Sequence, residues 1–266
     1  MQSNNKPTIL DELAAFASSR VEEAKKHINL ADIKRMAEDL PKGDFEFEKA
    51  LRKEGLSFIL ECKKASPSKG VIAPDFPYVK IAKDYELAGA DCISVLTEPK
   101  WFLGRDEYLK EISSTVKIPC LRKDFTVDEY MIYEAKTLGA SAVLLIVSIL
   151  SAAQIREYLD ICNELAISAI VETHDEDEAG VAVEAGAAII GVNNRDLRDF
   201  SVDSGNSRAL RKIIPDDRIF VSESGISTPE DVAAVYAAGA DAVLIGEAVM
   251  RAEDKGAALN MLRSML

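Results

Sequence analysis

The most constraining feature of the sequence is a short pattern that occurs four times at nearly regular spacing. Each copy consists of a helical end, a glycine, an alanine, a small residue and an apolar run. Glycine just after a helix supplies the left-handed backbone conformation that releases the chain into a following strand. Each copy therefore predicts a helix followed directly by a buried strand. The four copies are 87–96, 138–147, 184–193 and 237–246.

The spacing of these copies predicts a further strand between each neighbouring pair. Their glycines are separated by 50, 47 and 53 residues, which is too long for one strand and one helix. An apolar run fills each gap, and another run precedes the first copy, so that eight strands alternate with helices. Alternating elements indicate a parallel sheet, and eight near-continuous apolar strands favour its closure into a barrel. The four additional runs are 57–64, 116–125, 166–174 and 218–226.

The predicted fold is α/β, a single (β/α)8 TIM barrel with an N-terminal helical extension. One domain is expected to span residues 1–266, with the extension at 1–50 and the barrel at 57–266, because such barrels commonly have about 250 residues. In the extension, helical spacing of apolar residues predicts one helix over 8–26 and a second around 45–54. These helices are expected to cover one mouth of the barrel.

Net charge and hydropathy exclude several classes of partner. The net charge of −13 argues against nucleic acid, which needs a basic face, and against steady binding to an anionic membrane. No apolar run approaches the roughly 18 residues that cross a bilayer, and the first residues lack the apolar core of a signal peptide. The expected partner is a small molecule. The sequence does not decide the oligomeric state, and a monomer is compatible with it.

The cysteines and histidines predict neither a disulfide framework nor a metal site. The four cysteines show no C-x-x-C spacing, most lie in apolar runs, and the chain has only two histidines. We expect buried, reduced thiols, no metal, and a reducing cytoplasm as the location. The cysteines are Cys62, Cys92, Cys120 and Cys162, and the histidines are His27 and His174.

Five of the predicted strands end in polar or charged residues that share a face with the apolar interior. In a TIM barrel the active site lies at these C-terminal strand ends. Three cations and three carboxylates would meet there with one amide, and they would partly compensate one another and shift one another's pKa values. A polar plug without function is the alternative, and five such strands make it less favoured. These residues are Glu61, Lys63, Lys123, Glu172, Asn193, Arg195 and Glu223.

The loops after the last two strands predict a phosphate site. Loops in these positions usually cradle phosphate in this fold, and glycine allows close approach of the backbone. Ser224, Gly225, Gly246 and Glu247 can offer backbone N–H groups there. Residues 66–70 after the first strand are expected to form a mobile flap, from which Ser66 or Lys69 reaches a bound anion. Packing on an aromatic substrate and core packing stay open for Trp101 and Phe102, and His174 is not expected to be catalytic.

Seven motifs in order resemble those of the indole-3-glycerol-phosphate synthase family. They extend from the first strand to the eighth: ECKKASPSKG, TEPKWFLG, LRKDF, VETH, GVNNRDL, SESGI and LIGEAVM. The resemblance implies a carboxy-lyase of tryptophan biosynthesis that needs no metal or organic cofactor. The implied substrate is 1-(2-carboxyphenylamino)-1-deoxyribulose 5-phosphate. Ring closure with decarboxylation and dehydration converts this substrate into the product.

The resemblance also implies roles for individual residues. Lys123 would be the general acid for ring closure, and Lys63 would bind the substrate carboxylate and donate a proton in dehydration. Glu172 would be the base or would stabilise positive charge near the anilino nitrogen. Which lysine performs which proton transfer stays open. Glu61, Asn193 and Glu223 would orient these groups, and Arg195 would attract the anionic substrate.

Binding roles follow from the same resemblance. The phosphate would lie on Ser224, Gly225, Gly246 and Glu247. Some relatives have serine where Glu247 stands, and because a glutamate side chain cannot donate to phosphate, only its backbone N–H is carried over. Phe102, Phe125 and Leu197 would pack on the anthranilate ring.

Two other functions compete with this interpretation. A phosphoribosylanthranilate isomerase is expected to use cysteine and aspartate on early strands, where this chain has Glu61 and Lys63. A catalytically silent barrel would bind a phosphorylated metabolite without turnover. A silent barrel has no physical need for six compensating charges, so the ring of charges argues against it.

Overall fold

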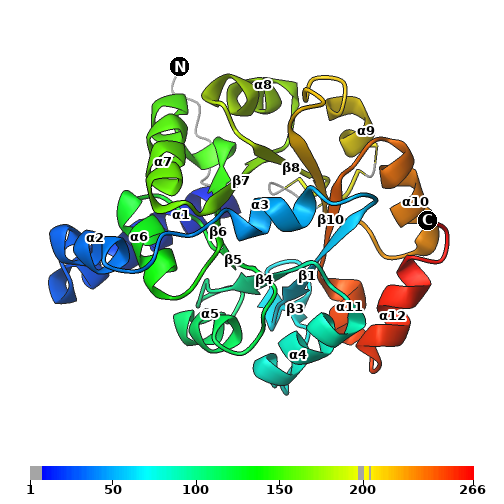
Figure 1. The fold of residues 1–266 in the computed structure, drawn as a ribbon, viewed down its shortest axis with the longest axis horizontal. Helices are drawn as coiled ribbons and strands as arrows, with labels where there is room; N and C mark the ends of the chain where they lie inside the picture. The colour runs from blue at the N-terminus through cyan, green and yellow to red at the C-terminus, as the bar shows by residue number, and fades with distance from the viewer. Residues whose placement is uncertain (1–7, 197–200, 204) are drawn as a thin grey trace.

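The computed structural model describes residues 8–196, 201–203 and 205–266, and its sheet confirms the predicted TIM barrel (Figure 1). In this part of the chain, eight parallel strands close on themselves in the order β1-β10-β9-β8-β7-β6-β5-β4. The barrel strands are β1 (Ser57–Cys62), β4 (Cys92–Leu96), β5 (Cys120–Lys123), β6 (Ala142–Ile146), β7 (Ser168–Thr173), β8 (Ile189–Asn193), β9 (Ile219–Glu223) and β10 (Ala242–Ile245).

Alternation along each strand separates two apolar clusters. Inward side chains such as Ile59, Leu121 and Ile170 fill the barrel, and the outward side chains between them pack against the helices. The register pairs Leu96 with Lys123 and Asn193 with Glu223, so the ends of neighbouring strands lie at the same level. Lys123 of β5 is within ion-pair distance of Glu172 of β7 and Glu223 of β9, and β5 is not a neighbour of either strand in the sheet. These three side chains therefore meet inside the barrel, which confirms the predicted inward face for them.

Helices surround the barrel between its strands, and their starts follow the expected capping chemistry. Thr228 caps α10 reciprocally with Asp231, and Pro229 occupies the first helical position. None of the helices among the described residues is long and apolar enough to cross a membrane. The helices are α4 (Tyr78–Ala88), α5 (Asp106–Ser113), α6 (Glu129–Thr137), α7 (Ala152–Leu165), α8 (Glu176–Ala185), α9 (Asn206–Leu210), α10 (Pro229–Ala237), α11 (Glu247–Arg251) and α12 (Lys255–Leu262), with a 3-10 turn η1 (Val147–Ile149).

The N-terminal extension covers both ends of the barrel, so the prediction that it covers one mouth is wrong. Helix α3 (Glu46–Leu51) inserts Phe47 into the apolar interior at the end where the strands begin, and it lies across the near end of the barrel in Figure 1. Helix α1 (Ile9–His27) lines the opposite mouth with Leu13. A third helix, α2 (Leu30–Glu38), was not expected and packs beside α6.

The loop after β1 has structure of its own. Residues 66–70, which were expected to form a flap, lie within the antiparallel hairpin of β2 (Ala65–Ser66) and β3 (Gly70–Val71). The mobility of this hairpin stays a prediction.

The cysteines are free and buried, as the sequence predicts. The pKa of each thiol is raised by burial, to about 12 in the case of Cys162. These thiols act as small apolar groups in the protein core.

Candidate active site

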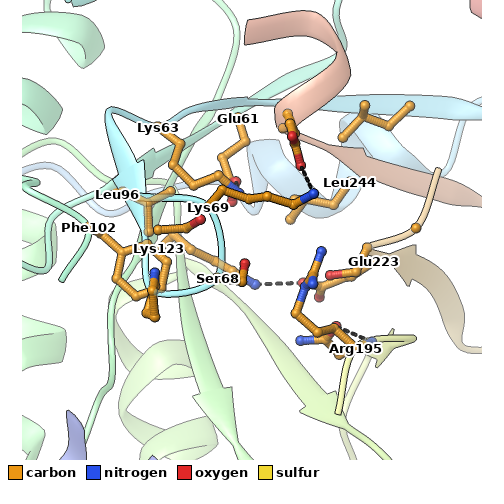
Figure 2. Close-up of a pocket in the computed structure, with 18 of the residues that line it drawn as sticks. Glu61, Lys63, Ser68, Lys69, Leu96, Phe102, Lys123, Arg195, Glu223 and Leu244 are labelled. Atoms are coloured by element: carbon orange, nitrogen blue, oxygen red, sulfur yellow. Dashed lines mark hydrogen bonds and ion pairs between the residues drawn. The ribbon is translucent and has the colours of Figure 1, made fainter. Parts of the chain in front are cut away.

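A cavity of about 500 Å³ opens where the barrel strands end, and it gathers the predicted site residues (Figure 2). Figure 2 shows side chains from several strands pointing into this one space. Of the predicted residues, Leu197 lies outside the described part of the chain. The others all line the cavity: Glu61, Lys63, Ser66, Phe102, Lys123, Phe125, Glu172, Asn193, Arg195, Glu223, Ser224, Gly225, Gly246 and Glu247.

The base of the cavity holds a lysine between two carboxylates. The Nζ atom of Lys123 lies 2.9 Å from Oε2 of Glu172 and 2.6 Å from Oε2 of Glu223. Both carboxylates are almost completely buried, and Asn193 donates from Nδ2 to Oε1 of Glu172 at 3.2 Å. Because buried charges are costly unless paired, this arrangement fixes all three charged groups in one geometry.

The surroundings of Lys123 keep it protonated. Burial acts to lower the pKa of its ammonium group, because a charge is poorly solvated there. The carboxylates of Glu172 and Glu223 outweigh burial and raise the pKa of Lys123 above its usual range. The free enzyme therefore presents an ammonium group with a proton to give.

The two carboxylates have opposite pKa shifts. Burial raises the pKa of both, but Lys123 and His174 hold that of Glu172 down at about 2. For Glu223, burial and the negative charge of Glu172 outweigh Lys123, and its pKa is raised to about 7. Close carboxylates titrate as a pair, so one of the two holds a proton over much of the acidic range.

Replacing Glu223 with glutamine is expected to stabilise the fold at pH 8. Because the folded pKa of Glu223 lies above its ordinary value of 4.5, the native state binds the extra proton and loses stability as pH rises through about 7. Glutamine removes this loss. We measure the effect of Glu223→Gln as the free energy of unfolding of the variant minus that of the wild type. This difference is expected to be about 1–2 kcal/mol more positive at pH 8 than at pH 5. Urea denaturation at both pH values measures the difference, and an effect that is equal at the two would contradict the assignment.

A second ion pair lies beside the first. Lys63 Nζ is 2.6 Å from Oε1 of Glu61, and a Cβ atom on Gly246 would lie 2.5 Å from the same oxygen. A Cβ atom on Gly191 would likewise lie 2.3 Å from Oε1 of Glu223. Both glycines therefore leave room for a buried carboxylate. For Gly246, the sequence motif indicated only a contact with phosphate and gave no sign of this second requirement.

The loop after β9 has an unusual backbone conformation. Ser224 and Gly225 adopt successive positive φ angles of 67° and 75°, a left-handed conformation that is common for glycine but uncommon for serine. Such strain in a non-glycine residue is typical of functional loops. Asn194 holds the turn by donating to the carbonyl oxygen of Ser224 at 3.1 Å.

The loop after β10 carries a neutralised carboxylate. Glu247 lies 3.6 Å from Nζ of Lys69 on the β2–β3 hairpin and 3.1 Å from Nε of Arg251. The two cations offset its charge at the rim of the cavity, and Figure 2 shows Lys69 extending over this rim. The sequence motif gave no signal for this pairing.

Aromatic side chains form one wall. Phe102 and Phe125 line the cavity with ring centroids 6.1 Å apart, whereas Trp101 packs edge-on against Phe16 of α1 at 5.5 Å. Trp101 and Phe102 therefore differ. Phe102 lines the cavity, where it can contact a substrate, whereas Trp101 packs against the protein core. The carboxylate of Glu98, which the sequence analysis missed, holds this loop by accepting bonds from three successive backbone N–H groups.

Asp124 is a further residue that sequence reasoning missed. It follows Lys123 directly, lines the cavity, and accepts two bonds from Arg20 of α1, at 3.1 and 2.6 Å. Thr97 donates to it at 2.6 Å. A charged residue directly after an inward-facing lysine was the available signal. Among the described residues, no three His, Cys, Asp or Glu side chains are arranged to hold a metal ion.

Solved structures of other proteins share the barrel fold. A thiamine phosphate pyrophosphorylase from Pyrococcus furiosus matches with a TM-score of 0.61 and 17% identity, over 82% of this chain and 96% of that one. A 3-hexulose-6-phosphate synthase matches with a TM-score of 0.61 and 18% identity, over 79% and 100% of the two chains. At this level of identity the comparison supports the barrel fold alone.

Sequence comparisons identify the family. The family model described as indole-3-glycerol phosphate synthase matches residues 10–262. A protein of that name from Ruminiclostridium cellulolyticum is 54% identical, covering 96% of this chain and 98% of its own. Another from Endomicrobium trichonymphae is 52% identical, covering 91% and 95%. The chain belongs to the indole-3-glycerol phosphate synthase family, the carboxy-lyases that act in tryptophan biosynthesis.

Proposed function

We propose that Lys123, Glu172 and Glu223 form the proton-transfer centre of the ring-closing reaction. The observation that carries the proposal is the position of Lys123 Nζ, within 3 Å of two buried carboxylates at the base of the cavity. A proton donor and two acceptors therefore share one hydrogen-bonded unit. General acid–base catalysis requires proton donors and acceptors within hydrogen-bond reach of the reacting atoms, and all three side chains line the cavity in which the substrate is expected to bind.

Ring closure needs an acid at the ketone. When the aromatic carbon attacks, negative charge develops on the carbonyl oxygen, and a positioned ammonium group stabilises that charge and then donates its proton. Lys123 serves as this acid. Glu223 has a raised pKa and lies 2.6 Å away, so it can return a proton to the neutral amine.

Decarboxylation and dehydration complete the reaction. Glu172, held ionised by Lys123, acts as the base or stabilises positive charge near the anilino nitrogen. Lys63, oriented by Glu61, binds the substrate carboxylate and is the candidate donor to the departing hydroxyl. Asn193 orients Glu172 through its amide.

The two ends of the substrate match opposite sides of the cavity. The phosphate is expected on the backbone N–H groups of Ser224, Gly225, Gly246 and Glu247, with Ser66 and Arg195 nearby. The aromatic ring is expected to pack on Phe102 and Phe125, and the contact with Leu197 stays a prediction. Two fixed ends hold the reacting carbon and the ketone close together, which lowers the entropic cost of ring closure.

Turnover of the two candidate substrates tests the proposal. The purified chain is expected to convert 1-(2-carboxyphenylamino)-1-deoxyribulose 5-phosphate into a product with indole fluorescence, and to leave phosphoribosylanthranilate unchanged. Turnover of phosphoribosylanthranilate alone would favour the isomerase. Binding of the product without turnover of either substrate would favour the silent barrel.

A reducing cytoplasm is the proposed location. The four free, buried thiols support it, because an oxidising compartment favours disulfides in secreted domains.

A further inference from the structure

A polar cluster lies directly behind the cavity wall formed by β7. It consists of His174 after β7, Glu178 in α8 and Ser148 in η1. None of these three residues lines the cavity, although Glu172, two residues before His174, does. The cluster therefore reaches the proposed catalytic centre only through Glu172.

One side of the His174 ring is bound to a carboxylate. Its Nδ1 lies 3.0 Å from Oε2 of Glu178, and its backbone N–H donates to the same oxygen at 2.8 Å. The hydroxyl of Ser148 donates to the other oxygen of Glu178. Burial acts to raise the pKa of Glu178, but these hydrogen bonds outweigh it and lower the pKa. Glu178 is therefore an ionised acceptor, and Nδ1 carries a proton toward it.

The other side of the ring faces Glu172. Nε2 of His174 lies 3.5 Å from Oε1 of Glu172, is buried, and has no hydrogen-bond partner among the described residues. A neutral ring with its proton on Nδ1 would point the lone pair of Nε2 at this carboxylate, with no hydrogen-bond donor beside it among the described residues. Such an arrangement is repulsive and leaves a buried polar atom unsatisfied. A proton on both nitrogens replaces this repulsion with an ion-pair attraction to Glu172 across 3.5 Å.

The charged groups around His174 favour the protonated, positively charged form of its ring. Glu172 of β7, Glu178 of α8 and the more distant Glu223 of β9 are the charged groups that act on it. Ser148 is neutral, and Asn206 contacts only the backbone, by donating to the carbonyl oxygen of His174 at 3.0 Å. Burial acts to lower the pKa of His174, but the carboxylates outweigh it and the pKa is raised.

We propose that His174 is a positioning residue whose imidazolium, held by Glu178, faces Glu172 and stabilises the ionised form of the Glu172–Glu223 pair. This inference rests on the proposed role of that pair in the reaction. His174 itself touches neither the cavity nor the reacting atoms. It acts by adding one positive charge near Oε1 of Glu172, the oxygen that does not contact Lys123.

The charge of His174 can be measured without any assay of activity. The chain has two histidines, and His27 is exposed on α1, so His27→Gln leaves His174 as the single histidine. In ¹⁵N-histidine-labelled His27→Gln protein, we expect both ring nitrogens to be protonated at pH 7, with a titration midpoint above the ordinary value of 6.5. One unprotonated ring nitrogen at pH 7 would overturn the proposal. Because this result does not depend on turnover, it is independent of the proposed function.

The pH profile of activity tests the coupling to Glu172. Loss of a cation 3.5 Å away is expected to move the limb of the kcat/KM profile that reports the carboxylate pair upward by about one pH unit in His174→Asn. Glu178→Gln, which removes the anion that holds the imidazolium, is expected to move it in the same direction. His27→Gln is the control and is expected to keep the wild-type profile. A structural role would lower activity equally at every pH, and an unmoved limb in both variants would overturn the proposal.

Discussion

Replacing Lys123 with methionine is expected to lower kcat about a thousandfold while KM changes by no more than about threefold. A positioned general acid contributes on the order of 10²–10⁴-fold to rate, and Lys123 is the ammonium group held at 2.9 and 2.6 Å by Glu172 and Glu223. Methionine keeps the unbranched stem of the side chain as far as Cε but has no ammonium group and so no proton to donate. The expected phosphate and ring contacts involve other residues, so binding survives. Initial rates from product fluorescence give both constants.

Lys100→Met is the matched control for Lys123→Met. Lys100 is exposed on the loop after β4 with its ammonium over the Trp101 ring, and it forms no ion pair with Glu172 or Glu223. Its replacement is expected to change kcat less than twofold, since an exposed cation–π contact contributes about 0.5–1 kcal/mol to stability and none to proton transfer. A Lys123→Met enzyme with more than a tenth of wild-type kcat would mean that another group is the acid.

The barrel could be predicted from sequence because its signals are local and repeated. The glycine after each helix, here Gly89, Gly139, Gly186 and Gly239, has a positive φ angle, and an apolar run follows it in each case. The helix α2 carried no such signal, because its packing on α6 is a tertiary contact. The mouth covered by α3 was missed for the same reason. Short helices gain most of their stability from such contacts rather than from their own sequence.

For the candidate site, strand alternation predicted which side chains face the inside of the barrel, but not which of them pair. Period-two alternation placed Glu61, Lys123, Glu172 and Glu223 on the inner face, and the structure brings them together. Alternation does not predict which charges pair. The contacts of Glu98 with its own loop, of Glu247 with Lys69, and of His174 with Glu178 depend on loop paths and on which rotamers fit.

Replacing Asp124 with asparagine is expected to lower the free energy of unfolding by about 3–5 kcal/mol, the range for breaking a buried ion pair. The side chain of Asp124 is 0% exposed and is held by Arg20 and Thr97. Burial acts to raise its pKa, but Arg20 and Arg122 outweigh it and lower the pKa. Its contribution is therefore present above the ordinary value of 3.8 and is lost as pH falls through the lower folded value. Urea denaturation at pH 7 and pH 3 measures both effects.

A neighbouring ion pair provides the control for Asp124→Asn. Lys25 also joins α1 to the barrel, through Asp128 at 2.7 Å, but these side chains are 27% and 29% exposed. Ion pairs that are partly open to solvent contribute at most about 1 kcal/mol to the free energy of unfolding, so Lys25→Met is expected to have a small effect. Similar losses in the two variants would mean that apolar contacts of α1, rather than the buried charge, hold this helix in place.

Comparing Asp124→Asn with Lys25→Met also tests whether helix α1, which lines the cavity, contributes to activity. Helix α1 contributes Ile9 and Leu13 to the cavity lining, and the Arg20–Asp124 pair joins this helix to the strand end that carries Lys123. Asp124→Asn is therefore expected to lower kcat/KM even at temperatures where the variant is folded, because water enters and Lys123 loses its fixed position. Lys25→Met keeps the pair and is expected to keep kcat/KM. Equal activity in the two variants would show that α1 covers the cavity without contributing to the reaction.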